Sequence, residues 1–111
     1  MAGSFVIEKG NSGKYHFNLR AAGNYETLLT SETYETKAGA EGGIDSVRRN
    51  AKDDARVVRK TAKDGSPYFT LTATNGQVIG TSEMYSSTTA RDAGIESVKE
   101  NAPNATVIDR T

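Results

Sequence analysis

The chain is 111 residues long, carries 14 basic and 14 acidic side chains, and contains no cysteine. This length predicts a single domain, and the lack of cysteine excludes disulfides, Cys-ligated zinc and thiol nucleophiles. The charge balance argues against general nucleic-acid binding, because contact with a phosphate backbone needs concentrated positive charge. No apolar run approaches the length of a membrane span and no signal-peptide pattern opens the sequence, so we expect a soluble cytoplasmic protein with no membrane partner.

The sequence repeats itself along almost its whole length. Ser-Glu-Thr-Tyr at residues 31–34 returns as Ser-Glu-Met-Tyr at residues 82–85, a shift of 51 residues (82 minus 31). Gly-Ile-Asp-Ser-Val-Arg at residues 43–48 returns with the same shift as Gly-Ile-Glu-Ser-Val-Lys at residues 94–99. The matches predict one domain, residues 1–111, made of two repeats.

The two repeats, residues 4–54 and residues 55–111, each open with a predicted strand. The β-prone runs lie at residues 5–8 and 57–60, and a polar turn that contains glycine follows each of them. Apolar and polar side chains then alternate, which predicts a half-buried strand. In the first repeat the apolar side is formed by Tyr15, Phe17, Leu19 and Ala21.

A hairpin is predicted next in each repeat. The dipeptide Asn75-Gly76 is typical of a two-residue type I′ turn, and the extra residue at the same place in the first repeat predicts a three-residue loop with a bulge. The returning strands are residues 27–31 and 78–82.

This register makes a prediction about the two returning strands. It places Leu71 opposite Gly80 on the core side, and it points Ile79 and its equivalent Leu28 away from the helices. Two apolar residues at equivalent outward positions predict a contact surface. We therefore expect Leu28 and Ile79 to be covered by the other repeat or by a second chain.

The helices follow the hairpins. Thr36 and Ser87 are predicted N-caps, and the helices are predicted to end near Asn50 and Asn101, with asparagine in the left-handed position. Apolar residues recur between these bounds at helical spacing.

Glycine interrupts both apolar helix faces, and one more strand closes the chain. Gly43 and Gly94 each cost about 1 kcal/mol relative to alanine in a helix, so equivalent glycines suggest that the helix backbone closely approaches the sheet. The closing strand is predicted at residues 105–108.

The element order predicts an α+β fold. It reads as a tandem duplication of a β-β-β-α unit plus a closing C-terminal strand, with an antiparallel sheet, one helix per repeat and pseudo-two-fold symmetry. Whether the repeats share one sheet or form two packed sheets stays open. The predicted core comprises Phe17, Leu19, Ile44, Val47, Phe69, Leu71, Ile95 and Val98.

Few residues are candidates for chemistry. His16 is the single histidine and lies on the polar side of its strand, where the other repeat has Tyr68, so we interpret it as a surface residue rather than a catalytic or metal-binding one. Residues 38–43 are glycine-rich but lack the phosphate-loop ending. Asp53-Asp54 is not followed by the further acidic ligands of an EF-hand. We expect no catalytic residue, metal or cofactor.

Glu32 and Glu83 recur in identical Thr-Ser-Glu-x-Tyr settings. One interpretation is a pair of ligand sites, each with a glutamate and a tyrosine. The interpretation we favour is structural, in which the glutamate accepts backbone N–H bonds before the helix and the tyrosine packs on the sheet. The sequence leaves both open.

The segment from Arg48 to Lys63 is the one local excess of positive charge. It holds seven basic residues against two acidic ones. With Tyr15 or Tyr68 as stacking platforms it is a hypothetical nucleic-acid surface. The alternative is that the charges lie on different faces of a strand and a helix end.

Three segments of the sequence resemble those of a known family. They are Tyr-His-Phe-Asn-Leu-Arg-Ala-Ala at residues 15–22, Gly-Ile-Asp-Ser-Val-Arg-Arg-Asn-Ala at residues 43–51, and Asn-Gly-Gln-Val-Ile-Gly-Thr-Ser-Glu-Met-Tyr-Ser at residues 75–86. With their counterparts in the other repeat, they resemble the YegP-like family of small bacterial proteins over essentially the whole chain. The resemblance implies an α+β fold built by tandem duplication, and it implies no activity, because that family is a domain of unknown function.

Three functions follow from these observations. The first is a small, non-enzymatic cytoplasmic binding or interaction module, either a monomer or a weak homodimer, whose partner the sequence does not identify. The second is a weak nucleic-acid binder that uses the Arg48–Lys63 segment, although we do not expect nucleic acid as a partner. The third is an enzyme with an unrecognised site around Glu32 or Glu83.

Overall fold

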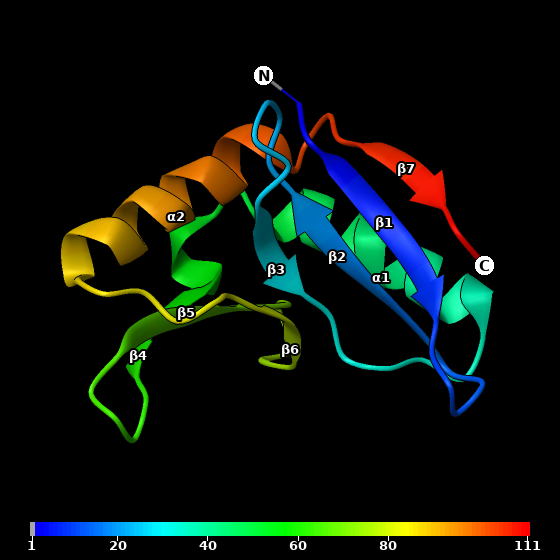
Figure 1. The fold of residues 1–111 in the computed structure, drawn as a ribbon, viewed down its shortest axis with the longest axis horizontal. Coiled ribbons are helices and arrows are strands. Elements are labelled where there is room, and N and C mark those ends of the chain that lie inside the picture. The colour runs from blue at the N-terminus through cyan, green and yellow to red at the C-terminus, as the bar shows by residue number, and fades with distance from the viewer. Residues whose placement is uncertain (1) are drawn as a thin grey trace.

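The computed structural model describes residues 2–111 as an α+β fold with one mixed sheet of seven strands and two helices (Figure 1). The strands are β1 (Ser4–Lys9), β2 (Tyr15–Arg20), β3 (Thr27–Thr30), β4 (Val57–Thr61), β5 (Pro67–Thr72), β6 (Val78–Thr81) and β7 (Thr106–Asp109). The helices are α1 (Lys37–Asn50) and α2 (Thr88–Asn101), and a 3₁₀ turn, η1 (Asp54–Arg56), precedes β4. Neither α1 nor α2 is long and apolar enough to cross a bilayer.

The strand order is β4-β5-β6-β3-β2-β1-β7, so all the strands share one sheet. The prediction of an antiparallel sheet is wrong for one pair, because β7 runs parallel to β1. The end of α2 lies beside the start of β1, where the Gly3 N–H donates to the Asn101 carbonyl at 3.4 Å. The chain therefore enters β7 at the end where β1 begins, and the two strands run in the same direction.

The second hairpin has a longer loop than its sequence predicted. Gly76 N–H donates to the carbonyl of Ala73, and Ala73 N–H donates to the carbonyl of Gln77, both at 2.9 Å. The loop is therefore the three residues 74–76, with Gly76 at φ +86°. Asn75 instead accepts the Gln77 N–H with its side chain at 2.9 Å, and this bond favours the longer turn over a type I′ turn.

The first hairpin is also one residue longer than predicted. Ala21 N–H donates to the carbonyl of Glu26 at 2.9 Å, which leaves the four residues 22–25 in the loop. Gly23 and Tyr25 have φ values of +88° and +58°.

The longer loops shift the register and create a bulge in each hairpin. Leu71 lies opposite Gly80 as predicted, but Thr72 lies opposite Val78. Ile79 is therefore the extra residue on its strand, and a bulge re-aims such a side chain.

Leu28 and Ile79 consequently belong to the core rather than to an outer contact surface. Their side chains are 3% and 7% exposed and join the single hydrophobic cluster beneath the helices. Strand β3 contacts α2, and β6 contacts α1. The prediction that both residues are covered is confirmed, and the covering elements come from the same chain. The predicted outward direction is wrong because of the bulges.

The two halves of the sheet meet between β3 and β6. One residue pair, Thr30 opposite Thr81, forms the ladder between these strands. On the helix-covered face, Leu29 packs against Gly80, where an added β-carbon would be 3.3 Å from the leucine side chain. The two halves are therefore held together both by this short ladder and by side-chain packing.

The predicted core is confirmed. All eight predicted residues are at most 2% exposed, and α1 packs on β2 while α2 packs on β5. The predicted N-caps are also confirmed, because Thr36 accepts the Gly39 N–H and Ser87 accepts the Ala90 N–H, both at 3.0 Å.

The helices end at the predicted asparagines, but these residues do not adopt the left-handed conformation. The C-caps, Ala51 and Ala102, have right-handed helical backbone. Asn101 is buried and donates its side-chain amide to the Ser97 carbonyl at 2.8 Å. Its side-chain oxygen accepts the Ala22 N–H at 3.1 Å, which ties the end of α2 to the first hairpin loop.

Candidate functional site

The serines of the two Ser-Glu-x-Tyr segments have a structural role. The Ser31 hydroxyl accepts the Phe17 N–H at 2.9 Å and donates to the backbone carbonyl of the next residue at 2.7 Å. Ser82 makes the same pair of bonds, with Phe69 N–H at 3.0 Å and the next carbonyl at 2.8 Å. Each serine therefore links a central strand to the segment that leads into a helix.

The tyrosines of these segments explain the helix glycines. The Tyr85 ring stacks on Phe69 at 6.3 Å between ring centres. A β-carbon on Gly94 would collide with the Tyr85 hydroxyl, and one on Gly43 would collide with that of Tyr34. The close approach predicted for these glycines is thus made by a tyrosine side chain rather than by the sheet backbone.

The glutamates do not have the role that the sequence suggested. The predicted backbone N–H bonds are accepted instead by the cap residues Thr36 and Ser87. Glu32 and Glu83 are exposed, and their carboxylates make no ion pair or hydrogen bond with any residue between 2 and 111. Folding therefore does not account for either carboxylate.

A cavity of about 340 Å³ lies between the first hairpin loop, β3 and α2. Small side chains of the helix form one wall, and Leu28 forms part of the other. The lining residues are Ala21, Asn24, Glu26, Leu28, Tyr85, Ala90, Ala93, Gly94 and Ser97. The cavity combines an apolar wall with polar groups, as small-molecule sites do.

The cavity has a negative electrostatic character. Burial raises the pKa of Tyr85 above its ordinary value of 10.0, and the carboxylates of Glu26 and Glu83 raise that pKa further. The Tyr85 hydroxyl is therefore protonated near neutral pH and is available to donate or accept a hydrogen bond. These groups favour a ligand with a positive or hydrogen-donating end.

The structure does not bring the predicted site residues together in the cavity lining. Glu83 acts on Tyr85 through its charge but does not line the cavity, and Glu32 is the corresponding carboxylate near Tyr34. His16 lies half-buried on the sheet with Nε2 at 3.5 Å from a Glu8 carboxylate oxygen. Within residues 2–111, no group of three potential metal ligands comes together.

Sequence reasoning missed most of the cavity lining. Ala90, Ala93 and Ser97 are small residues on one helix face, and this spacing is the one signal that indicates a gap over α2. Asn24 and Glu26 belong to a turn and carry no such signal. Only the three-dimensional path of the loop brings them to the helix.

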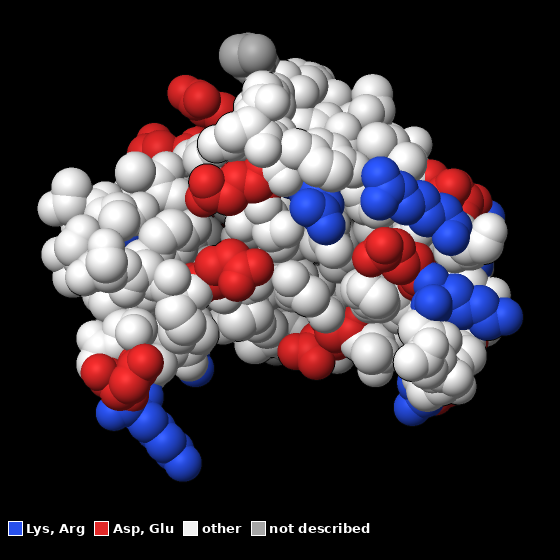
Figure 2. Space-filling model, in the orientation of Figure 1, with Lys and Arg blue, Asp and Glu red and all other residues white. Residues whose placement is uncertain are grey.

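Acidic neighbours neutralise part of the basic Arg48–Lys63 segment. Arg48 lies 3.5 Å from Asp45, and Arg56 lies 3.4 Å from Asp53. Figure 2 shows basic and acidic side chains interspersed on the face it displays, without a continuous basic surface. The arrangement does not favour tracking of a phosphate backbone.

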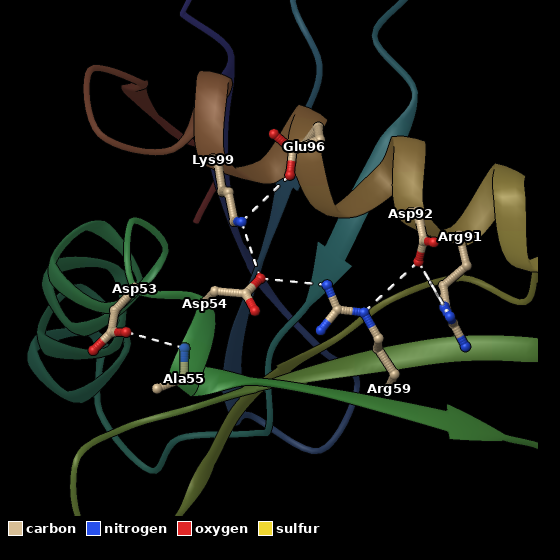
Figure 3. A network of polar contacts seen from close by, with 8 residues as sticks. All are labelled: Asp53, Asp54, Ala55, Arg59, Arg91, Asp92, Glu96 and Lys99. Carbon is tan, nitrogen blue, oxygen red and sulfur yellow. Dashed lines mark hydrogen bonds and ion pairs between the residues drawn. The ribbon is translucent and has the colours of Figure 1, made fainter.

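Another arginine of this segment, Arg59, takes part in a network that joins β4 to α2 (Figure 3). Asp54 lies 3.3 Å from Arg59 and 3.0 Å from Lys99, and Arg59 also lies 3.7 Å from Asp92. Hydrogen bonds from Lys99 and Arg59 lower the pKa of Asp54. The neighbouring Asp53 caps the 3₁₀ turn by accepting the Ala55 N–H at 3.0 Å. The acidic pair thus has structural roles.

Comparison with known proteins places the sequence in one family. Residues 11–57 and 62–109 each match the family described as domain of unknown function DUF1508. A UPF0339 protein of Bordetella pertussis is 62% identical over 111 residues, which cover all of this chain and 98% of the relative. The UPF0339 protein YegP of Escherichia coli O157:H7 is 49% identical, and the alignment covers both chains completely.

Two solved structures share the fold. The solution NMR structure of a UPF0339 protein from Shewanella oneidensis has a TM-score of 0.91 at 49% identity, covering 98% of this chain and 92% of that one. The solution NMR structure of yegP from E. coli, titled a protein of unknown function, has a TM-score of 0.93 at 48% identity, covering 100% of this chain and 95% of that one.

Proposed function

Since the chain belongs to the DUF1508 family of UPF0339 proteins, to which no activity is assigned, we propose its function from geometry: it is a small, non-enzymatic, cytoplasmic binding module. The observation that carries this proposal is the cavity over α2. There the Tyr85 hydroxyl and the Glu26 carboxylate face a wall of small side chains.

The cavity chemistry favours a small amine. A volume of about 340 Å³ suits a compact ligand. Ala90, Ala93 and Leu28 offer contacts to a short apolar body, and Glu26 offers a carboxylate to an ammonium group. The Tyr85 hydroxyl orients the ligand by accepting a hydrogen bond. Glu83, which has no structural partner, adds to the attraction for a cation.

The same groups do not favour catalysis. General acid–base catalysis works best with a group whose pKa lies near the working pH. The pKa of Tyr85 is shifted away from neutral pH, because burial raises it above 10.0. The histidine that would serve as a base, His16, lies outside the cavity lining.

An NMR titration of the full chain with n-butylammonium tests the proposal. We expect saturable shifts of the backbone resonances of Ala93, Ser97 and Glu26, and much weaker effects from butyrate, which has the opposite charge. Ala93→Leu fills the cavity and should abolish the shifts, while Glu26→Gln should weaken them. Gly42→Ala on α1 is the matched control. Equal shifts from the amine and the acid, or no shift at millimolar amine, would contradict the proposal.

We also infer that the two halves arose by tandem duplication of a β-β-β-α unit, with β7 as the closing strand. In support, the strand order reads β4-β5-β6 on one side and β3-β2-β1 on the other. The halves meet at Thr30 and Thr81, which are equivalent in the repeat, so an approximate two-fold axis passes between them.

The family match divides the chain at a different place. The first matched unit starts before β2 and ends at Val57, the first residue of β4. The second starts before β5 and ends at Asp109, the last residue of β7. This division leaves β1 and most of β4 outside the units, whereas a β-β-β-α unit leaves only β7 outside. The ambiguity arises because β4 follows α1 along the chain but pairs with β5 in the sheet.

A further inference from the structure

We propose that the groove between β7 and α1 binds an extended segment of a partner protein, which adds to the sheet beside β7 and places a lysine or arginine side chain against α1. The groove lies away from the α2 cavity, and this inference does not depend on the function proposed for that cavity.

Strand β7 offers an open edge. It is the last strand of the sheet and pairs with β1 alone. The Thr106 N–H donates to the carbonyl of Gly3, just before β1, at 3.1 Å, and the Arg110 N–H donates to the carbonyl of Ile7 in β1 at 2.9 Å. Successive residues of a strand direct these groups to opposite edges, so those of Val107 and Asp109 point away from β1. Such an edge is a template for a further strand.

Helix α1 forms the second wall of the groove and runs antiparallel to β7. At one end, the Arg48 guanidinium donates to the Ala105 carbonyl at 2.6 Å. At the other end, Lys37 forms an ion pair with Asp109. A cavity of about 250 Å³ lies between these two ties, lined by Glu41, Ile44, Asp45, Arg48 and Val107. An added strand would therefore have a pocket for one side chain.

The pocket has apolar residues on both walls, Val107 on β7 and Ile44 on α1. Val107 is 45% exposed although it is a large aliphatic residue, and buried Ile44 forms part of the lining. A long aliphatic stem that ends in a charge fits such a surface, because the stem packs on the apolar atoms while the charge stays near water.

The charges in the groove select a basic side chain. The Arg48 guanidinium is already held by the Ala105 carbonyl, stacks over the Phe5 ring at 5.4 Å, and lies 3.5 Å from Asp45. Glu41 makes no ion pair with a residue in the described range 2–111. Two cations lie near these carboxylates, but Lys37 is paired with Asp109 and Arg48 is held by the Ala105 carbonyl. The Glu41 carboxylate therefore remains for a partner cation.

The other edge of the sheet does not offer the same site. Strand β4 carries Arg59 and Lys60, and charges of this kind discourage edge pairing. Arg59 is also engaged by Asp54 and Asp92 across the space between β4 and α2 (Figure 3). Strand β7 has no basic residue among its four.

A second copy of this chain fits the groove poorly. If β7 paired antiparallel with β7 of another copy about Ile108, Val107 would lie opposite Asp109 of the other copy. The pairing would bring a carboxylate rather than a base towards Glu41. Charge complementarity therefore favours a basic segment of a different protein.

A peptide titration of the full chain, followed by NMR, tests the proposal. The probe is the capped peptide Thr-Thr-Val-Lys-Val-Thr-Thr, and the comparison peptide carries glutamate in place of the lysine. We expect the lysine peptide to shift Val107, Asp109 and Glu41 and to slow amide exchange at Val107 and Asp109. The glutamate peptide should bind at least about tenfold more weakly.

Two charge variants make the test specific. Glu41→Lys should weaken binding of the lysine peptide about tenfold and improve binding of the glutamate peptide. Glu100→Lys makes the same change in net charge on the exposed surface of α2 and should leave both affinities unchanged. Ala93→Leu in the other cavity should also have no effect.

Three outcomes would overturn the proposal. The first is the absence of any shift at millimolar peptide. The second is equal binding of the two peptides, or shifts that centre on β4. The third is concentration-dependent protection of Val107 and Asp109 without peptide, together with a dimer in sedimentation, which would assign the edge to a second copy.

Discussion

The hydroxyl oxygen of Tyr85 lies so close to the position of a β-carbon on Gly94 that the two atoms could not both be present without a shift. The contact fixes the distance between α2 and the segment that follows β6. Both residues also line the cavity that we propose as a ligand site. The helix therefore needs glycine at this position although alanine is the better helix former.

The Tyr85–Gly94 contact predicts opposite effects for two glycine substitutions. Gly94→Ala should lower the free energy of unfolding by about 1–3 kcal/mol, because the added methyl group displaces the ring. Gly42→Ala on α1 has no atom within 4 Å of the new carbon and should raise stability by up to about 1 kcal/mol. Denaturant unfolding of both variants checks this, and effects of the same sign would contradict it.

A double-mutant cycle separates the clash from other effects of the Gly94 change. In a Tyr85→Ala background, Gly94→Ala should become neutral or stabilising, since the ring is gone. A penalty that persists in this background would show that the glycine is needed for another reason.

Two threonines on the same face of β5 give a second pair of predictions. The Thr70 hydroxyl is buried and has no hydrogen-bond partner within residues 2–111, so Thr70→Val should be neutral or stabilising by about 1 kcal/mol. The Thr72 hydroxyl donates to the Arg56 carbonyl at 3.0 Å, so Thr72→Val should cost about 0.5–1.5 kcal/mol. In thermal unfolding, Thr70→Val should therefore have a higher midpoint temperature than Thr72→Val.

The covered residues Leu28 and Ile79 predict a stability effect without a change of assembly. Replacing both with serine removes apolar contacts and buries hydroxyl groups, and each change should cost about 2–5 kcal/mol. Sedimentation should give the mass of a monomer for the parent chain. Dissociation of a parent dimer by the double variant would show instead that a second chain covers these residues.

The tyrosine pKa shift predicts a loss of stability at high pH. Burial and nearby carboxylates raise the pKa of Tyr85 in the folded protein above 10.0. The folded state therefore binds this proton more tightly than the unfolded state. The associated stability is fully present below the unfolded pKa and is lost as pH rises through the folded value. Unfolding followed from about pH 9 to pH 12 should show this loss.

Tyr85→Phe tests the assignment of that pH dependence. The variant should reduce the loss, and the remainder should come largely from Tyr34, whose pKa is also raised by burial. An unchanged pH profile in Tyr85→Phe would show that other groups control stability in this range.

The charge arrangement predicts no specific nucleic-acid binding. Three of the seven basic residues in the segment, Arg48, Arg56 and Arg59, are close to carboxylates, which reduces the positive charge available to displace counterions from a phosphate backbone. Fluorescence anisotropy with RNA and DNA oligonucleotides at about 50 and 200 mM salt should show no saturable binding. A steep salt dependence that is lost when Lys52, Lys60 and Lys63 become glutamine would contradict this.

The sequence by itself determined the elements, their order and most of the core. Alternation around Phe17 and Phe69 placed the central strands, helical spacing around Ile44 and Ile95 placed the helices, and the caps followed from Thr36 and Ser87. These features depend on local periodicity and local hydrogen bonds, which neighbouring residues in the chain specify.

Only the tertiary structure decided the turn lengths and the features that depend on residues far apart in the chain. The side chain of Asn75 bonds to the Gln77 N–H and lengthens the turn, and the resulting bulge turns Ile79 into the core. The direction of β7 depends on where α2 ends relative to β1. The cavity over α2 exists because Glu26 and Tyr85 meet there from different halves of the chain. Such meetings follow from the path of the whole backbone, which local spacing does not determine.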